Sequence, residues 1–240
     1  MNPRRSVSTG ANIGIRYERY INQLLKNKGL QPKNIVSAGA TVSPNGFVDY
    51  HSMRFPIEIK KDLSADFAQI ELNWDRKKRF FYSKRSKNTE FISILKKEKF
   101  LDEINTRWNG IPRKFTQKIL TKNDRYRDLD EFPDIKREIE ANLVEQFYNL
   151  KTPPIHYMQI GGYGFFCMGK DVAGLGVPRL MGKGILRARI KTRNSRKNLY
   201  GFLVAIKLRT LKHSNYDIEE KNGKNFPFPK FNDSSALFGR

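Results

Sequence analysis

Two acidic residues and a lysine near residue 50 form the group in this sequence best suited to chemistry. Asp49 lies in the stretch FVDY, and Glu58 and Lys60 lie in the stretch PIEIKK. Carboxylate oxygens bind hard divalent cations, and Mg²⁺ keeps several of its waters when it is bound. A nearby lysine can position or deprotonate a water, or stabilise charge on a phosphate. The combination predicts metal-dependent phosphodiester hydrolysis, with Asp49 and Glu58 as the metal ligands.

A second interpretation gives these three residues only a structural role. Opposite charges on neighbouring strands form ion pairs that contribute little stability when they are exposed. Ile57 and Ile59 flank Glu58, however, and this pattern predicts a largely buried strand. A buried unpaired charge is costly, so the apolar setting favours a functional role.

The elements around this group follow from hydrophobic periodicity. Residues 13–28 carry apolar side chains at helical spacing and are followed by Gly29, which predicts an amphipathic helix that includes Glu18. Residues 35–43 are typical of a strand, and the PNG sequence at 44–46 indicates a turn.

Two adjacent strands are predicted next, at 47–53 and 55–61, with Glu58 and Lys60 on one face of the second strand. Ser64 is a suitable N-cap, which favours a helix that begins at ADFAQIEL and contains Gln69.

The order of these elements and residues resembles the PD-(D/E)xK nuclease superfamily. Asp49 and the Glu58-x-Lys60 triplet match the signature, with eight residues between the two acids, and Val48 stands where the signature has proline. Glu18 matches an acid that many members carry on the preceding helix. Gln69 matches a glutamine that some members carry after the signature.

The resemblance covers roughly residues 13–85 and implies a restriction-endonuclease-like α/β fold, a mixed sheet flanked by helices, followed here by a basic β-rich C-terminal half. It implies that Asp49, Glu58, Lys60, Glu18 and Gln69 are the catalytic residues. It further implies an endonuclease that uses Mg²⁺, with Mn²⁺ as a substitute, and that cuts double-stranded DNA as a homodimer, with a restriction or homing enzyme as the expected type.

A competing copy of the signature occurs at 132–140, in the stretch FPDIKREIE. Its apolar residues fit a helical period that continues through 134–149, so we interpret its charges as the exposed face of a helix. The first copy is therefore preferred.

Positive charge dominates the composition. The 240 residues include 46 Lys and Arg against 24 Asp and Glu, a formal charge of +22. Such a surface favours a polyanionic partner, and binding to nucleic acid is expected to weaken steeply with salt. The predicted DNA contacts are Lys77, Lys78, Arg79, Lys84, Arg85, Arg187, Arg189, Lys191, Arg193, Arg196 and Lys197.

The rest of the chain supplies fewer functional signals. A strand is predicted at 79–84, a helix at about 90–108, a hairpin at 156–169 and a strand pair at 183–193 and 199–209. The expected division is a nuclease core at 1–110, a helical connector at 111–155, a basic β-rich DNA-binding region at 156–213 and a tail at 214–240.

Cysteine content and hydropathy limit the setting. Cys167 is the single cysteine, which excludes an internal disulfide and a cysteine-rich zinc site. No apolar stretch approaches the ~20 residues of a membrane span, and the first residues lack the apolar core of a signal peptide. We therefore expect no membrane partner and an intracellular location.

Two other functions remain open from the sequence. One is a structure-specific nuclease such as a Holliday junction resolvase, which would prefer branched DNA. The other is a basic nucleic-acid-binding protein without catalysis, in which the acids only balance charge.

Overall fold

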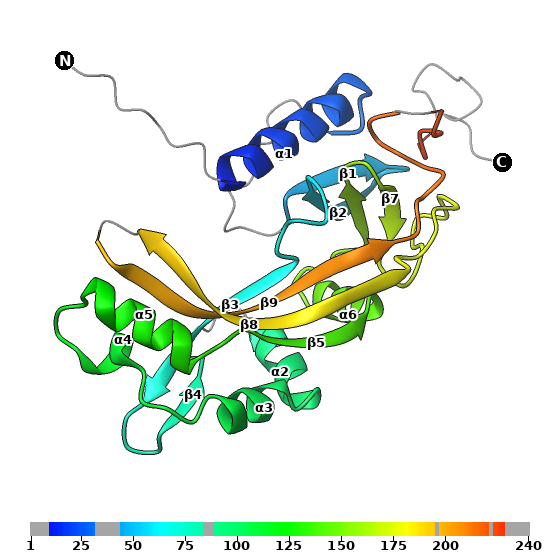
Figure 1. Cartoon of the computed structure of the whole chain (residues 1–240). Helices are drawn as coiled ribbons and strands as arrows, with labels where there is room; N and C mark the ends of the chain where they lie inside the picture. Colours follow the sequence, from blue (N-terminus) through cyan, green and yellow to red (C-terminus); the bar gives the residue numbers. More distant parts are fainter. Residues whose placement is uncertain (1–9, 32–43, 84–88, 195–196, 221–222, 229–240) are drawn as a thin grey trace, which may run out of the picture. The chain divides into compact units, whose positions relative to one another are not determined.

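The computed structural model describes residues 10–31, 44–83, 89–194, 197–220 and 223–228. The protein is a mixed α/β protein with two sheets (Figure 1). Its contacts divide the chain into two units, neither of them continuous in sequence. Unit 1 comprises residues 1–65, 148–182 and 210–240, and unit 2 comprises residues 66–147 and 183–209.

Unit 1 contains a four-stranded sheet in the order β1-β2-β6-β7. Strands β1 and β2 form an antiparallel hairpin, β6 pairs parallel with β2, and β7 pairs antiparallel with β6. The elements are α1 (Gly10–Asn27), β1 (Gly46–Tyr50), β2 (Met53–Lys60), β6 (Tyr157–Ile160) and β7 (Gly164–Cys167).

Helix α1 forms where the sequence predicts it, because its buried side chains recur every four residues. Ile21 and Leu25 are fully buried against the sheet. The helix ends at Asn27, and Gly29 follows with a positive φ of 70°, which lets Leu30 N donate to Leu25 O at 2.9 Å. This αL termination needs glycine, since other residues meet a Cβ clash there.

One apolar face of the unit 1 sheet packs against α1 and the C-terminal strap, residues 214–220 and 223–228. Ile57 and Ile59 of β2 lie in this core with Ile218 and Phe228 of the strap. The strap is therefore part of the packed unit, in agreement with its isolated apolar residues.

Unit 2 contains a five-stranded sheet in the order β4-β3-β9-β8-β5, in which β8 and β9 are the two long strands (Figure 1). Its core is a cluster of aromatic rings in which Phe81, Trp108, Phe132 and Phe202 meet mainly edge to face. Edge-to-face contacts suit the ring quadrupoles.

Unit 2 is built from strands and short helices. They are β3 (Ala68–Asp75), β4 (Phe80–Tyr82), α2 (Thr89–Lys97), α3 (Phe100–Arg107), α4 (Arg113–Thr116), α5 (Lys122–Glu131), β5 (Ile135–Glu140), α6 (Asn142–Asn149), β8 (Gly182–Asn194) and β9 (Leu199–Leu211), of which α6, β8 and β9 extend at one end into unit 1.

Several predicted elements are confirmed. They include the first helix, the strands that carry Asp49 and Glu58, the hairpin around residue 162 and the two long strands near the C-terminus. The helical region at 90–108 forms as α2 and α3, which are separated at Lys99. The strand predicted at 35–43 lies outside the described residues.

Two predicted helices are wrong. Gln69 lies on strand β3, where buried Ile70 and Leu72 alternate with more exposed Gln69 and Glu71. The first part of the helix predicted at 134–149 is strand β5, and only Asn142–Asn149 is helical. In both segments the alternating burial fits the two-residue period of a strand.

None of the helices in the described part of the chain is long and apolar enough to span a membrane.

Candidate active site

A buried ion pair at the end of strand β2 is the centre of the candidate site. The Nζ atom of Lys60 lies 2.7 Å from Oε1 of Glu58. The Glu58 side chain is 4% exposed and that of Lys60 is 16% exposed. The Tyr148 hydroxyl donates a hydrogen bond to the same Glu58 oxygen at 3.2 Å. Glu58 and Lys60 therefore meet on one face of the strand, as the sequence predicts.

Glu18 reaches this region from helix α1. It is buried, and its Oε1 accepts a hydrogen bond from Asn45 Nδ2 at 3.0 Å. Its other oxygen, Oε2, is buried and has no hydrogen-bond partner among the described residues. A buried carboxylate oxygen without a partner is costly, which makes it a candidate ligand atom.

The environment of Glu18 favours its protonated form. Burial, followed by the negative charge of Glu58, raises the pKa of Glu18 to about 7, and Lys60 partly opposes this effect. Two carboxyl groups that share a buried region compete for one positive charge. A bound cation beside both groups would reduce this repulsion.

Asn45 connects helix α1 to the strand pair. Its Nδ2 also donates to Ile59 O at 3.1 Å, while Asn22 Nδ2 donates to Asn45 O at 3.1 Å. Gly46 lets this contact form, because a Cβ at that position would lie 2.6 Å from Asn22 Oδ1. These amide contacts fix the position of Glu18 relative to β2.

Asp49 lies on the same hairpin as Glu58 but at its opposite end. Arg54 Nε and Nη2 donate to the two Asp49 carboxylate oxygens at 2.7 and 3.0 Å. The hairpin register places Asp49 opposite Arg54, four residues before Glu58. Four residues of extended strand span about 13 Å. The structure brings together Glu18, Glu58 and Lys60, and it holds Asp49 in a separate ion pair.

The hairpin turn fixes this register. His51 and Ser52 both have positive φ, 47° and 61°, as a two-residue turn of type I′ requires. The residue that faces Glu58 in the continued register is Asn45, one position before Gly46, whose partner is Ile57. Sequence reasoning missed Asn45 because the sequence alone does not give the hairpin register that places it opposite Glu58. The PNG turn signal, which includes Asn45, indicates only a turn.

Gln69 belongs to unit 2, where it lies on the charged face of the five-stranded sheet. Its Cα partner on β9 is Ala205, and Lys191 Nζ lies 3.4 Å from its Oε1. Gln69 therefore contacts Lys191 of β8, a predicted DNA-binding residue, and it is not among the residues gathered around Glu58.

The basic residues of strand β8 are paired with acids from other segments of unit 2. Arg193 Nη2 lies 2.7 Å from Glu71 Oε2, and Arg187 binds the carboxylate of Asp134. Arg189 and Lys191 lie within 3.8 Å of Asp66, and Lys207 of β9 lies 3.2 Å from it. The sequence contains no acid between residues 179 and 212, so these partners were not predicted from the local pattern.

Four of the remaining predicted DNA contacts are exposed, and the other three lie outside the described residues. Lys77, Lys78 and Arg79 form an exposed turn between β3 and β4, which Asp75 holds by accepting from the Lys77 and Lys78 backbone amides at 2.9 Å. Lys197 is exposed at the tip after β8. Lys84, Arg85 and Arg196 lie outside the described residues.

Within the described ranges, no three His, Cys, Asp or Glu side chains gather closely enough to hold a metal ion by themselves. Glu18 and Glu58 supply two carboxylates, and Mg²⁺ in proteins commonly uses one or two carboxylates together with water and substrate oxygens. The donor set is compatible with a cation of that kind.

Comparison with protein-family models, with curated proteins and with solved structures gave no match in any of the three.

Proposed function

We propose that this protein is a Mg²⁺-dependent endonuclease that hydrolyses phosphodiester bonds of double-stranded DNA at the Glu58 site of unit 1. The observation that carries the proposal is the buried group of Glu18, Glu58 and Lys60, in which two carboxylates lie beside one ammonium. An ion pair with no function would be expected at lower cost on the surface.

The topology of unit 1 supports a restriction-endonuclease-like core. Helix α1 precedes a hairpin, β6 pairs parallel with the second hairpin strand, and Tyr148 at the end of α6 binds Glu58. In this proposal the two segments of unit 2, residues 66–147 and 183–209, are insertions into the core, and their charged sheet contacts the substrate.

The chemistry assigned to each residue follows from its contacts. Glu58 and Glu18 would hold Mg²⁺ or Mn²⁺, which polarises a phosphoryl oxygen and lowers the pKa of bound water. Lys60 Nζ lies beside Glu58 Oε1, the oxygen that Tyr148 also contacts, and it can stabilise charge that develops on the phosphate. Tyr148 keeps Glu58 oriented, and Asn45 does the same for Glu18.

The net charge of +22 and the exposed Lys77, Lys78 and Arg79 turn support a nucleic-acid substrate. Each lysine or arginine contact to a phosphate releases condensed counterions. A duplex-cutting enzyme of this kind usually needs two active sites, which a homodimer would supply, whereas a nickase needs only one. We therefore propose a sequence-specific restriction or homing role, with branched DNA as the competing substrate.

Incubation of the full chain with supercoiled plasmid and Mg²⁺ tests the proposal. We expect nicked or linear products, which EDTA abolishes and which Glu58→Gln lowers at least about 100-fold, the range for loss of a catalytic group. Arms with branched DNA and with RNA define the substrate, and sedimentation measures the oligomeric state. Intact plasmid, junction and RNA with wild-type protein would refute the enzyme.

A non-enzymatic nucleic-acid-binding function is the second candidate. Two ion pairs favour this function, because in each of them an acid neutralises a neighbouring cation. Arg187 pairs with Asp134, and Arg193 pairs with Glu71. It predicts metal-independent binding without cleavage, and equal binding by wild type and Glu58→Gln.

A further inference from the structure

Basic side chains of β8 reach across β9, which lies between β8 and β3 in the five-stranded sheet of unit 2. Arg193 Nη2 lies 2.7 Å from Oε2 of Glu71 on β3. Lys191 Nζ lies 3.8 Å from Oδ2 of Asp66, two positions before β3, and 3.4 Å from Gln69 Oε1. These two cations therefore lie over the sheet and are paired with acids from the strand beyond β9.

Gly201 of β9 makes room for the pair of Arg193 and Glu71. A Cβ at position 201 would lie 2.9 Å from Glu71 Oε1 and 3.5 Å from Arg193 Nε. The first of these distances is too short for a side-chain carbon, so another residue would displace the pair. The ion pair thus crosses directly over the β9 backbone, and glycine permits the crossing.

Asp66 gathers more positive charge than its carboxylate balances. The carboxylate lies 3.7 Å from Arg189 Nη2, 3.8 Å from Lys191 Nζ and 3.2 Å from Lys207 Nζ. Arg189 and Lys191 alone give it two positive neighbours for one negative charge. Both Asp66 Oδ1 and Arg189 Nε are buried and lack a hydrogen-bond partner among the described residues. A phosphate, with more acceptor oxygens than a carboxylate, would suit these donors better.

The cations are more open to solvent than the acids that they pair with. The Lys191 and Arg193 side chains are 45% and 49% exposed, whereas those of Asp66 and Glu71 are 16% and 22% exposed. An anion that approaches this face of the sheet therefore meets the cations first. Exposed ion pairs contribute little stability, so a phosphate can compete with the carboxylates for these cations.

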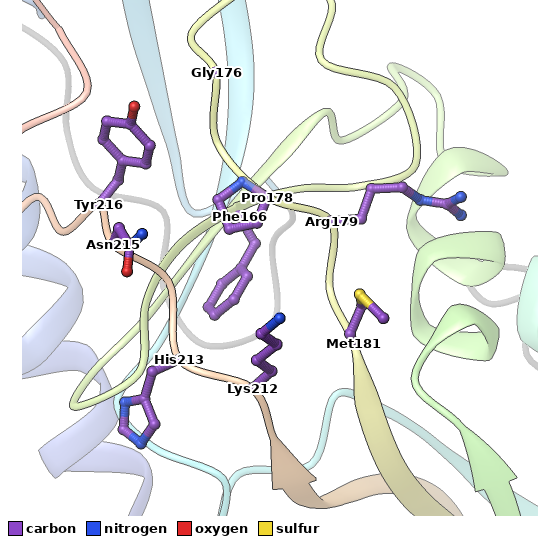
Figure 2. Close-up of a pocket in the computed structure, with 9 residues that line it drawn as sticks. All are labelled: Phe166, Gly176, Pro178, Arg179, Met181, Lys212, His213, Asn215 and Tyr216. Atoms are coloured by element: carbon purple, nitrogen blue, oxygen red, sulfur yellow. The ribbon is translucent and has the colours of Figure 1, made fainter.

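This convergence of charge is absent from the cavity that Lys212 and Arg179 line in unit 1 (Figure 2). Figure 2 shows the Arg179 guanidinium directed away from Lys212, so the two cations do not face one point. In unit 2, by contrast, Arg189 and Lys191 both lie within 3.8 Å of one carboxylate. An anion at that carboxylate's position would contact both of them.

We propose that Asp66 and Glu71 are internal competitors for the phosphates of a nucleic-acid strand, which binds to Lys191 and Arg193 on this face of unit 2. The two acids lower the affinity of the face for polyanions, so a strand binds well only where its phosphates reach several cations at once. The inference rests on the proposed function for nucleic acid as the ligand, and it makes the two acids determinants of specificity.

Binding measured without cleavage tests the proposal. The full chain carrying Glu58→Gln is titrated, in EDTA, against a fluorescent duplex at several salt concentrations. Addition of Glu71→Gln or Asp66→Asn should raise the affinity about fivefold, the value for one exposed ion pair. Each should also steepen the slope of log K against log salt by about one, the contribution of one phosphate contact.

Two controls separate local competition from a change in total charge. Asp102→Asn removes an exposed acid of helix α3 and adds the same charge to unit 2, and it should change the affinity less than twofold. Arg193→Gln should weaken binding, and Glu71→Gln added to Arg193→Gln should give no fivefold gain, because the cation that Glu71 competes for is gone. Inorganic phosphate at constant ionic strength should not displace the duplex at millimolar concentration.

This proposal and the nuclease proposal fail separately. Plasmid cleavage by wild type, together with Glu71→Gln and Asp66→Asn variants that bind no better than Asp102→Asn, would overturn the competition and leave the nuclease. A specific gain in affinity with no cleavage by wild type would support the competition and overturn the nuclease. A gain from Glu71→Gln that persists beside Arg193→Gln, displacement by free phosphate, or absence of DNA binding would overturn the competition.

Discussion

Asp49 and Arg54 face each other across the β1–β2 hairpin and share two hydrogen bonds, at 2.7 and 3.0 Å. This contact separates Asp49 from Glu58 and gives it a partner of its own. It also defines the first of four testable predictions.

The Asp49→Asn variant should retain plasmid cleavage within about threefold of wild type, because Asp49 lies about 13 Å along the hairpin from Glu58 and pairs with Arg54 instead. Glu58→Gln, assayed beside it, should lose cleavage. The initial rate of nicking in Mg²⁺ is the measurement. If Asp49→Asn is as inactive as Glu58→Gln while both variants remain folded, Asp49 belongs to the catalytic site and the assignment made here is wrong.

Glu18 should make the protein less stable as pH rises. The pKa of Glu18 is raised from 4.5 to about 7 in the fold, so the folded chain binds more protons than the unfolded chain between these values. Stability conferred by the protonated carboxyl is full below about pH 4.5 and is lost as pH rises through 7.

Urea unfolding of wild type and Glu18→Gln at pH 5 and pH 8 measures this effect. The wild type should lose up to about 3 kcal/mol more than the variant over this range, from 1.36 kcal/mol per pKa unit. Histidines titrate in both proteins, so the difference between the two isolates Glu18. Parallel pH profiles would show that Glu18 is not protonated in the fold.

Asn45 should control the affinity of the site for Mg²⁺. In Asn45→Asp, a carboxylate replaces the amide that donates to Glu18 and to Ile59 O, which adds repulsion near Glu18 and Glu58. We expect a lower melting temperature in EDTA and a larger Mg²⁺-induced increase than in wild type, because the ligand binds the folded state. Asn45→Ala, which lacks a ligand atom, is the control. Equal Mg²⁺ responses in all three proteins would contradict the assignment.

Asp128 should be a main stabilising residue of unit 2. It is fully buried and accepts hydrogen bonds from the Arg113 and Lys114 backbone amides at 2.9 and 3.0 Å and from the Tyr200 hydroxyl at 2.7 Å. Asp128→Ala should lower the free energy of unfolding by about 2–4 kcal/mol, since buried donors lose a charged acceptor.

Tyr200→Phe is the matched variant for Asp128, because it removes one donor and keeps the ring. It should cost about 1–2 kcal/mol. Urea denaturation at pH 7 measures both changes. A loss for Asp128→Ala no larger than that for Tyr200→Phe would indicate that the two backbone amides find other acceptors.

The sequence predicted the elements of unit 1 well where local spacing determines them. Ile21, Leu25 and Gly29 specify a helix and its end, and Ile57 and Ile59 specify a strand that carries Glu58 and Lys60 on one face. The contact between Glu58 and Lys60 could be predicted because both residues lie on one strand. The contacts of Glu58 with Tyr148 and of Glu18 with Asn45 join separate elements, and no local pattern indicates them.

One feature of the site and one strand of unit 2 were hidden by ambiguous or missing signals. The hairpin turn at His51 and Ser52 lacks the glycine that usually marks positive φ, so the register that separates Asp49 from Glu58 was not evident. In β5, Ile135 and Ile139 are four residues apart, a spacing that fits a helix and a strand equally. Tertiary pairing with β8 then decides in favour of the strand.

The parallel pairing of β2 with β6 gives the Glu58 region a high contact order. Glu58 and its partner Tyr148 are 90 positions apart in the chain, and Lys60 pairs with Ile160. During synthesis, a nascent chain of 110 residues contains Glu18, Asn45 and Lys60 but lacks the strand on which β2 must pair. Tyr148 and β6 can therefore complete the Glu58 site only after residues 66–147 of unit 2 have been made, which places the completion of this centre late in folding.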